Sequence, residues 1–386
     1  MLKSFWPTKK LTDLCKLERG TEPGSDSYVK DLVGTIPFLR VGDLTGKVDA
    51  KRFVKKSNNN LQVVNKNETL ITFDGTPGIV VRRFSGAIAS GIRVIRNLKP
   101  EINGDFLFYY LQTPVVQKTI RAYSKGATII HASAAIPYIK ILLPPLKTQR
   151  KIVERLDTIK KAQELNDKQI ELAEELFQSL LHRELDPKGK NWEIKKIEDV
   201  AEVTSSKRIF QNEYVVKGVP FYRTKEIVEL SENKPISLEL FISEKRFEEI
   251  KKKFGAPQKG DLLISAVGTI GISWVVSDDR KFYFKDGNLL WIKNFKGIDP
   301  FYLKMVLDSI IKAISKISAG AAYNALTIMK VKKIQIPIPP FETQRKIVEK
   351  LSTVQEYKKK LLDQKQKLQE LFESVLNKSM RGELVK

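Results

Sequence analysis

The side chains that most enzymes use for catalysis are scarce in this sequence. It contains two histidines, His131 and His182, and a single cysteine, Cys15. These are too few to assemble a zinc cluster from histidine and cysteine ligands. His131 is expected at the surface of an Ala/Ser-rich loop, and His182 near a helix C-terminus, whose dipole favours a cation. No metal site is therefore predicted.

Motifs for phosphates and nucleotide cofactors are also missing. No G-x-x-x-x-G-K-[S/T] sequence occurs, so the chain has no predicted binding loop for ATP. The sequences GTPG (75–78) and GTIG (268–271) lie between strand-like runs. Paired glycines in that setting suit tight turns better than phosphate loops. No cofactor is predicted.

Two further patterns resemble enzyme motifs without completing them. LPPL (143–146) and IPPF (338–341) are similar to the Asn/Asp-Pro-Pro-aromatic motif of adenine methyltransferases, but Leu143 and Ile338 replace the hydrogen-bonding residue. FEEIKKKF (247–254) carries acidic and basic residues as nucleases do, yet its pattern is typical of a charged helix face. We therefore predict no catalysis by the chain itself and expect any methylation chemistry to belong to a partner.

The charge balance is the strongest global signal. The chain has 68 Lys and Arg against 45 Asp and Glu, a net charge of +23. Such an excess causes self-repulsion and usually has an anionic partner, of which nucleic acid is the commonest. Non-specific stickiness like that of ribosomal proteins, or a lysine-rich source organism, would be the alternatives.

The candidates for contact with DNA are basic or amide residues in loops beside predicted strands. They are Arg40, Lys51, Arg52, Lys55, Lys56, Asn58, Asn59, Arg82, Arg83 and Lys125 in the first half, and Lys207, Arg208, Arg223, Lys225, Lys285, Tyr323 and Asn324 in the second. Arginine can bond guanine, and asparagine adenine, through paired hydrogen bonds in the major groove. Arg40 and Arg223 occupy matching positions in a repeated sequence, so a structural role for both stays open.

Length and composition indicate an ordinary globular protein. At 386 residues the chain suits two or three domains. It has no run of about 18 apolar residues, so no membrane span is predicted. The N-terminus, MLKSFWPTKK, lacks the apolar core of a secretory signal. A single cysteine suits a reducing compartment, so a cytoplasmic location is expected.

The chain contains a long internal repeat. PPLKTQRKIVERL (144–156) returns as PPFETQRKIVEKL (339–351), with ten of thirteen positions identical. IPFLRVGDL (36–44) corresponds to VPFYRTKEI (219–227), and ETLITFDGTPG (68–78) to DLLISAVGTIG (261–271). The spacing is far longer than the 20–50 residues of a solenoid repeat, so it indicates a duplicated half-protein with pseudo-twofold symmetry.

Each half is predicted to be an α+β module followed by a long helix. Short runs rich in β-branched and aromatic residues predict a mixed or antiparallel sheet with short helices. Residues 106–120 and 301–317 show the periodicity of amphipathic helices. After each double proline, over 35 residues without glycine or proline predict a helix of roughly 50 Å, with Thr148 as the N-cap of the first.

Both long helices carry a heptad stripe with a polar centre. Its positions are 152, 156, 159, 163, 166, 170, 173, 177 and 180, and in the second helix 347, 351, 354, 358, 361, 365, 368, 372 and 375. A single narrow stripe needs a partner. We expect the two helices to form an antiparallel pair within the chain, in which Gln163, Asn166, Lys358 and Lys365 fix the register or face another subunit. A homodimeric coiled coil is the alternative.

These features together resemble the specificity (S) subunit of type I restriction–modification systems. The resemblance spans essentially the whole chain. The matching sequences are PPLKTQRKIVERLDTI (144–159) and PPFETQRKIVEKLSTV (339–354), LFQSLL (176–181) and LFESVL (371–376), with VPFYR and GTIG inside the modules. One departure is that the second helix ends in SVLNKSMRGEL, whereas the first ends in the shorter SLLHREL, without the glycine.

The resemblance implies two target-recognition domains, residues 1–143 and 187–338, each binding one half of a split, asymmetric site in double-stranded DNA. Two antiparallel spacer helices, residues 144–186 and 339–386, would set the half-site separation and dock two adenine methyltransferase (M) subunits; the complete enzyme adds restriction (R) subunits. The helix residues expected in docking and spacing are Gln149, Arg150, Ile152, Leu156, Ile159, Phe177, Gln344, Arg345, Ile347, Leu351, Val354 and Phe372.

Two other classes of function stay open at this point. The chain could be a stand-alone basic coiled-coil adaptor or regulator that binds DNA without specificity, or a nuclease or fused methyltransferase. A specific reader should hold its site about 10³-fold or more above bulk DNA. Cleavage or methyl transfer by the purified chain alone would instead indicate an enzyme.

Overall fold

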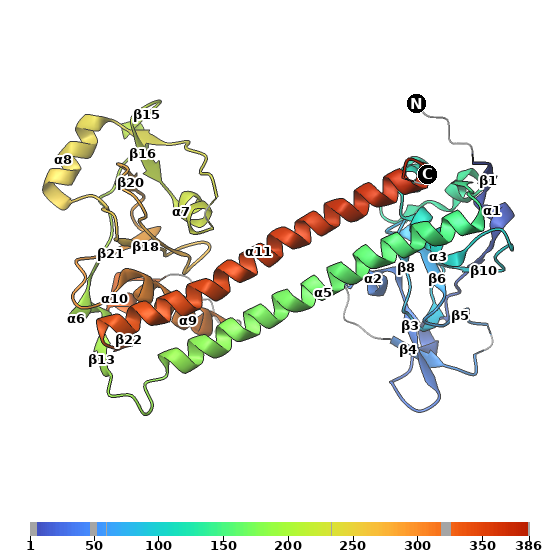
Figure 1. Ribbon diagram of the computed structural model, residues 1–386, viewed down its shortest axis with the longest axis horizontal. Coiled ribbons are helices and arrows are strands. Elements are labelled where there is room, and N and C mark those ends of the chain that lie inside the picture. Colours follow the sequence, from blue (N-terminus) through green and yellow to red (C-terminus); the bar gives the residue numbers. More distant parts are fainter. Residues whose placement is uncertain (1–5, 47–51, 59, 233, 318–325, 385–386) are drawn as a thin grey trace. The chain divides into compact units, whose positions relative to one another are not determined.

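The chain folds into two compact units. The computed structural model describes residues 6–46, 52–58, 60–232, 234–317 and 326–384. Unit 1 comprises residues 1–168 and 362–386, and unit 2 comprises residues 169–361. Each unit holds one α+β module and segments of both long helices, α5 (Leu146–Leu185, green) and α11 (Phe341–Met380, red; Figure 1). The candidates Lys51, Asn59, Tyr323 and Asn324 lie outside the described residues.

Unit 1 contains two four-stranded sheets. The antiparallel one has the order β2 (Lys16–Arg19), β10 (Ile92–Arg96), β6 (Thr69–Thr72), β8 (Val80–Val81). The mixed one has the order β4 (Arg52–Lys55), β3 (Thr35–Leu39), β9 (Gly86–Ile88), β5 (Val63–Val64), with β3 and β9 parallel. Shorter ladders join β1 (Thr8–Lys10) to β12 (Lys140–Leu142) and β7 (Asp74–Gly75) to β11 (Ile130–His131). The helices of the module are α1 (Leu11–Leu14), α2 (Val41–Leu44), α3 (Gly104–Leu111) and α4 (Pro114–Ala122).

Unit 2 repeats the antiparallel sheet and the parallel strand pair of the mixed sheet, but its mixed sheet has a different edge strand. Its antiparallel sheet has the order β14 (Glu202–Thr204), β21 (Leu289–Lys293), β18 (Leu262–Ser265), β19 (Ser273–Val275). Its mixed sheet has the order β15 (Tyr214–Val215), β17 (Phe241–Ile242), β16 (Val219–Tyr222), β20 (Tyr283–Phe284), and β13 (Glu193–Lys196) pairs with β22 (Gln335–Ile338). The helices are α6 (Ile197–Val200), α7 (Thr224–Ser231), α8 (Glu244–Phe254), α9 (Pro300–Ile317) and α10 (Ile328–Lys332). The predicted α+β class and duplication are confirmed.

The two glycine-rich turns are built by the same hydrogen bonds. Thr72 Oγ1 in unit 1 donates to Thr76 O and accepts from Ile79 N, and Ser265 Oγ in unit 2 bonds Thr269 O and Ile272 N in the same way. Gly78 and Gly271 follow with positive φ angles of 92° and 85°. Each turn therefore closes a β-hairpin, as predicted, and is not a phosphate loop.

The helix expected at residues 106–120 is two helices. Pro114 fixes the backbone of Thr113 in an extended conformation (ψ 149°), so α3 ends at Leu111 and α4 begins at Pro114. The counterpart α9 has no internal proline and runs unbroken from Pro300 to Ile317, as expected. The prediction failed because it followed the apolar periodicity across a residue that cannot donate a helical hydrogen bond.

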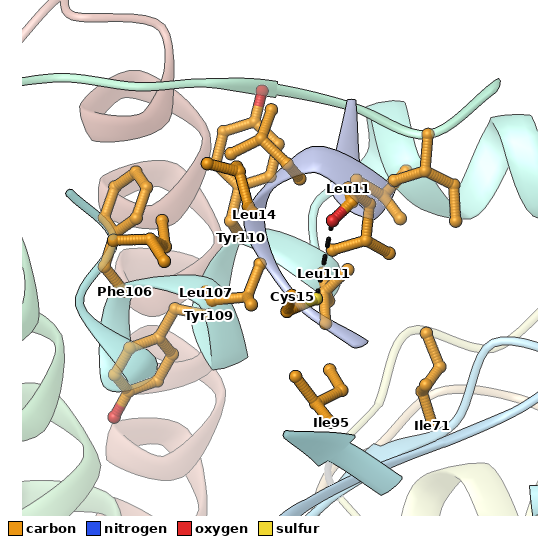
Figure 2. Packing of buried hydrophobic residues seen from close by; sticks show 14 of the residues in the cluster. Leu11, Leu14, Cys15, Ile71, Ile95, Phe106, Leu107, Tyr109, Tyr110 and Leu111 are labelled. Carbon is orange, nitrogen blue, oxygen red and sulfur yellow. Dashed lines mark hydrogen bonds between the residues drawn. The ribbon is translucent and has the colours of Figure 1, made fainter. Parts of the chain in front are cut away.

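The module of unit 1 encloses an apolar core on which the long helices pack. Figure 2 shows part of it, with Leu11 and Leu14 of α1 and Phe106 of α3 among the labelled side chains. Leu376 and Met380 from the end of α11 belong to the same buried cluster. Cys15 is 7% exposed and its Sγ lies 3.5 Å from Leu11 O. Burial raises the pKa of the Cys15 thiol to about 12, so it is an inert core residue.

Both long helices span 40 residues, or about 60 Å at 1.5 Å per residue. They start directly after the double prolines, at Leu146 and Phe341, because Pro145 O and Pro340 O accept the first helical bonds. The prediction of Thr148 as the N-cap was therefore wrong: its own N–H already donates to Pro145 O.

Within each unit the helix segments run antiparallel and the predicted stripe faces inward. In unit 1 Gln163 Nε2 donates to Leu368 O (3.2 Å) and Lys365 pairs with Asp167 (2.8 Å). In unit 2 Lys358 pairs with Glu174 at 2.6 Å. All eighteen stripe positions are buried or half-buried except Lys365. The predicted antiparallel pairing within one chain is confirmed in each unit.

Candidate DNA interface and helix surface

Two arginines of unit 1 pack against one tyrosine ring. The guanidinium carbons of Arg40 and Arg52 lie 5.7 and 5.5 Å from the Tyr28 ring centroid. Arg40 Nη2 also donates to the Tyr28 hydroxyl (2.8 Å), while Arg40 N donates to Asp43 Oδ2 and so caps α2. The Arg40 backbone is therefore structural, as its repeated position suggested, but its side chain reaches solvent.

Three other candidates of unit 1 follow Arg52 closely in sequence, whereas Lys125 is distant from it. Lys55 and Lys56 are exposed at the end of β4, and Asn58 is half-buried with its Oδ1 accepting from Asn60 N. Lys125 is exposed, and its backbone is paired with His131. His131 has a 64% exposed side chain, as expected, but it lies in strand β11 and not in a loop, and its Nδ1 lies 2.9 Å from Asp74 Oδ1.

Arg82 and Arg83 are adjacent in sequence but differ in environment. The Arg82 side chain is 24% exposed; it pairs with Asp105, donates to Thr69 Oγ1 and Gly104 O, and packs on the Phe108 ring. These contacts hold α3 on the sheet and give Arg82 a structural role. Arg83 has a positive φ of 72°, a side chain 83% exposed, and a 3.4 Å contact with Glu164.

The candidates of unit 2 are largely paired with carboxylates. Arg223 contacts Glu226 (2.8 Å) and Glu239 (2.7 Å), and Lys225 contacts Glu239 (2.5 Å). Hydrogen bonds from Lys225 and Arg223 lower the pKa of Glu239 to about 2, and those from Glu226 and Glu239 raise the pKa of Arg223. Because Glu226 is 1% exposed, Arg223 is needed to balance a buried charge.

The remaining candidates of unit 2 are exposed. Arg208 pairs with Asp286 at 2.9 Å, and Lys207 Nζ lies 4.5 Å from the Phe254 ring centroid. The Lys285 side chain is exposed, and only its backbone N–H has a described partner, Tyr222 O.

Gln149 and Gln344 anchor the long helices to their modules. Both are fully buried. Gln149 Oε1 accepts from Asn103 N (2.7 Å), and its Nε2 donates to Glu101 O (2.9 Å) and Pro144 O (2.8 Å). Gln344 makes the same three bonds, to Asp299 N, Gly297 O and Pro339 O. Neither side chain is accessible to a partner, so we assign both a structural role.

The other expected helix residues divide between core and surface. Ile152, Leu156, Ile347 and Leu351 are fully buried in the module cores, while Ile159, Val354, Phe177 and Phe372 are half-buried along the stripe. Arg150 and Arg345 are exposed, with Arg345 over the Phe341 ring at 4.9 Å. His182 lies in the last turn of α5, where it was expected.

Outward-facing leucines on the helices were not among the predicted residues. Leu176 of unit 2 and Leu371 of unit 1 are 51% and 48% exposed and occupy matching positions of the repeat. The repeated LF sequence carried the signal: its phenylalanine faces the stripe, and the leucine before it must face outward.

Tyr28 was also missed. It corresponds to Tyr214, since DSYVK (26–30) and NEYVV (212–216) each precede the first repeated strand of the mixed sheet. Comparing these two tyrosines would have marked the position as part of the duplicated framework.

The described residues contain no group of three His, Cys, Asp or Glu side chains placed to hold a metal ion. In the same parts of the chain, no helix combines the length and apolarity needed to cross a membrane.

Comparison with known proteins shows which family shares this architecture. Residues 3–175 and 189–371 match the family model of the type I restriction modification DNA specificity domain. A putative type I restriction enzyme specificity subunit of Haemophilus influenzae is 31% identical over 65% of this chain and 64% of its own length. The MjaVIII specificity subunit of Methanocaldococcus jannaschii is 24% identical over 98% of this chain and 93% of its own.

A solved structure shares the fold over nearly its full length. The type I restriction-modification S subunit from M. genitalium superposes with a TM-score of 0.60 at 15% identity, covering 98% of this chain and 97% of that one. Since the family model covers both modules and most of both long helices, the chain belongs to the type I restriction modification DNA specificity family.

Proposed function

We propose that the two units recognise different halves of one split DNA sequence. The observation that carries this is the duplication itself: the units share the strand order of the antiparallel sheet, the hairpin turns and the glutamine anchors but differ in their basic side chains. Phosphate neutralisation by the chain, whose net charge is +23, would supply most of the affinity for DNA. A few base contacts in each unit would determine the sequence specificity.

The long helices would set the distance between the two half-sites. Each is continuous over 40 residues and contributes to both units. DNA presents the same face every helical turn, about 34–36 Å. Two recognition units that bind the same face therefore need a stiff spacer of about that length. An antiparallel helix pair of about 60 Å has sufficient length.

The outer faces of the helices would dock two adenine methyltransferase subunits, which would supply the chemistry. Leu176 and Leu371 are half-exposed at equivalent positions of the repeat, as expected if the same partner binds twice. Restriction subunits would be further partners of the complete enzyme.

Genome-wide mapping of methylated adenines after co-expression with the methyltransferase subunit tests the DNA-reading proposal. The expected result is methylation within a bipartite, asymmetric consensus. A palindromic consensus, or methylation without sequence preference, would contradict it. Incubation of the purified chain alone with DNA, Mg²⁺ and S-adenosylmethionine should give neither cleavage nor methyl transfer.

The docking proposal has its own test. Leu176→Asp and Leu371→Asp should each reduce the mass of the assembled complex by one methyltransferase subunit, and the double variant by two. Leu165→Asp is the matched control, because Leu165 is 65% exposed on α5 but its repeat position in α11 is Lys360. Equal losses in all three single variants would show a general effect of charge and not a repeated docking site.

A further inference from the structure

We propose that Arg40 and Arg52 are the residues with which unit 1 recognises guanine, and that Tyr28 positions them. This rests on the proposed function and deepens it, because it assigns one half-site to a named pair of side chains and to a base. Arginine bonds guanine O6 and N7 through two parallel N–H donors, a match that lysine cannot reproduce.

Strand pairing brings the group to one face of the mixed sheet. Phe38 in β3 lies directly opposite Arg52 in β4, so their side chains share a face. Arg40 is two residues after Phe38 and follows β3, so strand alternation directs it to that face too. The Tyr28 ring packs on Phe38, with 5.7 Å between ring centroids. Tyr28 thus rests on a buried residue and supports both arginines.

The tyrosine restricts both arginines while engaging few of their N–H donors. Stacking on an aromatic face employs the flat surface of a guanidinium and leaves its N–H groups in the plane free. Within the described parts of the chain, the one side-chain donor of the two arginines that is engaged is Arg40 Nη2, which bonds the Tyr28 hydroxyl at 2.8 Å. A side chain held in this way loses less conformational entropy when it binds.

No carboxylate among the described residues forms an ion pair with Arg40 or Arg52. Lys55 and Lys56, exposed at the end of β4, place further positive charge along the same strand and suit contacts with the phosphate backbone. Arg40 is exposed and Arg52 is half-buried, and guanidinium groups that reach solvent without an acidic partner are available to an anionic ligand.

Unit 2 lacks this arrangement although it keeps the framework. Tyr214 packs on Phe221 with 5.4 Å between centroids, as Tyr28 does on Phe38. Leu240, whose carbonyl accepts from Phe221 N, stands where unit 1 has Arg52. Arg223, the counterpart of Arg40, is bound by Glu226 and Glu239. The guanine-reading pair is therefore specific to unit 1.

The test uses the full chain assembled with its methyltransferase subunits and a random-sequence DNA library, with the methylated fraction sequenced. Arg40→Lys and Arg52→Lys keep the positive charge and remove the two parallel N–H donors. Each should lower the preference for guanine at one or two positions of a single half-site by about 10- to 100-fold, while the other half-site is unchanged. Arg121→Lys, an exposed arginine of α4 outside the group, is the control and should change nothing.

Two tyrosine variants test the positioning role. Tyr28→Phe keeps the ring and should weaken only the preference that depends on Arg40, whereas Tyr28→Leu should weaken both. An unchanged consensus, a half-site without guanine, or a uniform loss of affinity at all sequences would overturn the inference, the last by showing phosphate contacts. A wild-type complex that gives no split consensus would instead overturn the proposed function, before any variant is compared.

Discussion

Gln149 in unit 1 and Gln344 in unit 2 make the same three hydrogen bonds, with equivalent distances that agree within 0.1 Å. Arg40 and Arg223 also occupy equivalent positions, yet one stacks on a tyrosine and the other is bound by two carboxylates. The two copies have thus kept the same contacts at the glutamine positions and have diverged in their contacts at the arginine positions.

The difference follows from the energetic cost of change at each position. A buried glutamine that satisfies backbone groups cannot be replaced without leaving those groups unpaired. The Arg40 side chain is exposed and has no ion pair among the described residues, so its replacement should cost little folding free energy, whereas its counterpart Arg223 has become part of a buried charge pair. Buried hydrogen bonds therefore preserve the framework, while solvent-facing side chains are free to acquire different specificities.

The largest effect is expected at the shared anchors. Gln149→Ala would leave Asn103 N, Glu101 O and Pro144 O without partners, which should cost about 3–5 kcal/mol of unfolding free energy. Gln344→Ala is the matched variant in unit 2 and should cost the same. Urea unfolding measures the loss, and hydrogen exchange assigns it to one unit. A loss below about 1 kcal/mol in either unit would mean that water replaces the anchor.

The second prediction sets Arg223 against Arg40. Arg223→Ala leaves Glu226 buried without its cation and should lower the unfolding free energy by about 2–4 kcal/mol. Arg40→Ala removes no ion pair among the described residues and should cost less than about 1 kcal/mol, while it impairs DNA recognition. Thermal unfolding and DNA binding, measured on both variants, check the contrast. Equal destabilisation would remove the distinction between the two positions.

The framework was predictable from sequence because it rests on short-range rules and on repetition. The turns at Gly78 and Gly271 follow from backbone freedom, and the stripe beginning at Ile152 follows from heptad spacing. The helix break at Pro114 could also have been predicted from local chemistry. It was overlooked because the apolar periodicity on both sides of Pro114 indicated one continuous helix.

The candidate interface was less predictable because it depends on which side chains the fold brings together. Arg82 follows strand β8 and Arg52 lies in strand β4, so both were basic candidates, yet Asp105, 23 residues away, makes Arg82 structural. Likewise Glu239 determines the role of Arg223 from 16 residues away. No spacing rule predicts such pairings. The sequence therefore identified basic candidates but could not separate those that pair with carboxylates from those that do not.

The third prediction concerns a difference between the two copies of the stripe. Asn166 in unit 1 is 1% exposed, and neither amide atom has a partner in the structure. The equivalent position in unit 2 is Leu361, 3% exposed. Asn166→Leu should therefore raise the unfolding free energy by about 1–2 kcal/mol, and Leu361→Asn should lower it. Urea unfolding measures both.

A stabilised Asn166→Leu variant that stays monomeric would show that asparagine is not needed for pairing within the chain. If the variant instead self-associates, as sedimentation would reveal, the buried amide serves to exclude other pairings of the helices. Loss of stability in Asn166→Leu would contradict the assignment of an unsatisfied amide.

The smallest effect is expected at a stripe position that carries an ion pair in unit 2 and a neutral hydrogen bond in unit 1. Glu174 bonds Lys358 at 2.6 Å, and mainly for that reason its pKa is lowered to about 2 from the ordinary 4.5. The repeat position of Lys358 in α5 is Gln163, which bonds Leu368 O in unit 1 without charge. Acid should therefore weaken the Glu174–Lys358 contact of unit 2 and leave the Gln163–Leu368 contact of unit 1 unaffected.

Because the pKa of Glu174 is lower in the folded state, its stabilisation is complete above about pH 4.5 and is lost as the pH falls toward 2. Its side chain is 37% exposed, so solvent screening limits the contribution to below about 1 kcal/mol. The difference in unfolding free energy between wild type and Glu174→Gln should shrink between pH 6 and 3, whereas exposed Glu175→Gln should show no such trend. Hydrogen exchange over the same range should report the change in residues 169–185 and 341–361. In Glu174→Gln the change should disappear from those segments, and its persistence there would mean that acid acts through other groups. Residues 146–168 and 362–380 are not a neutral reference, because Asp167 pairs with Lys365 in that part of the helix pair.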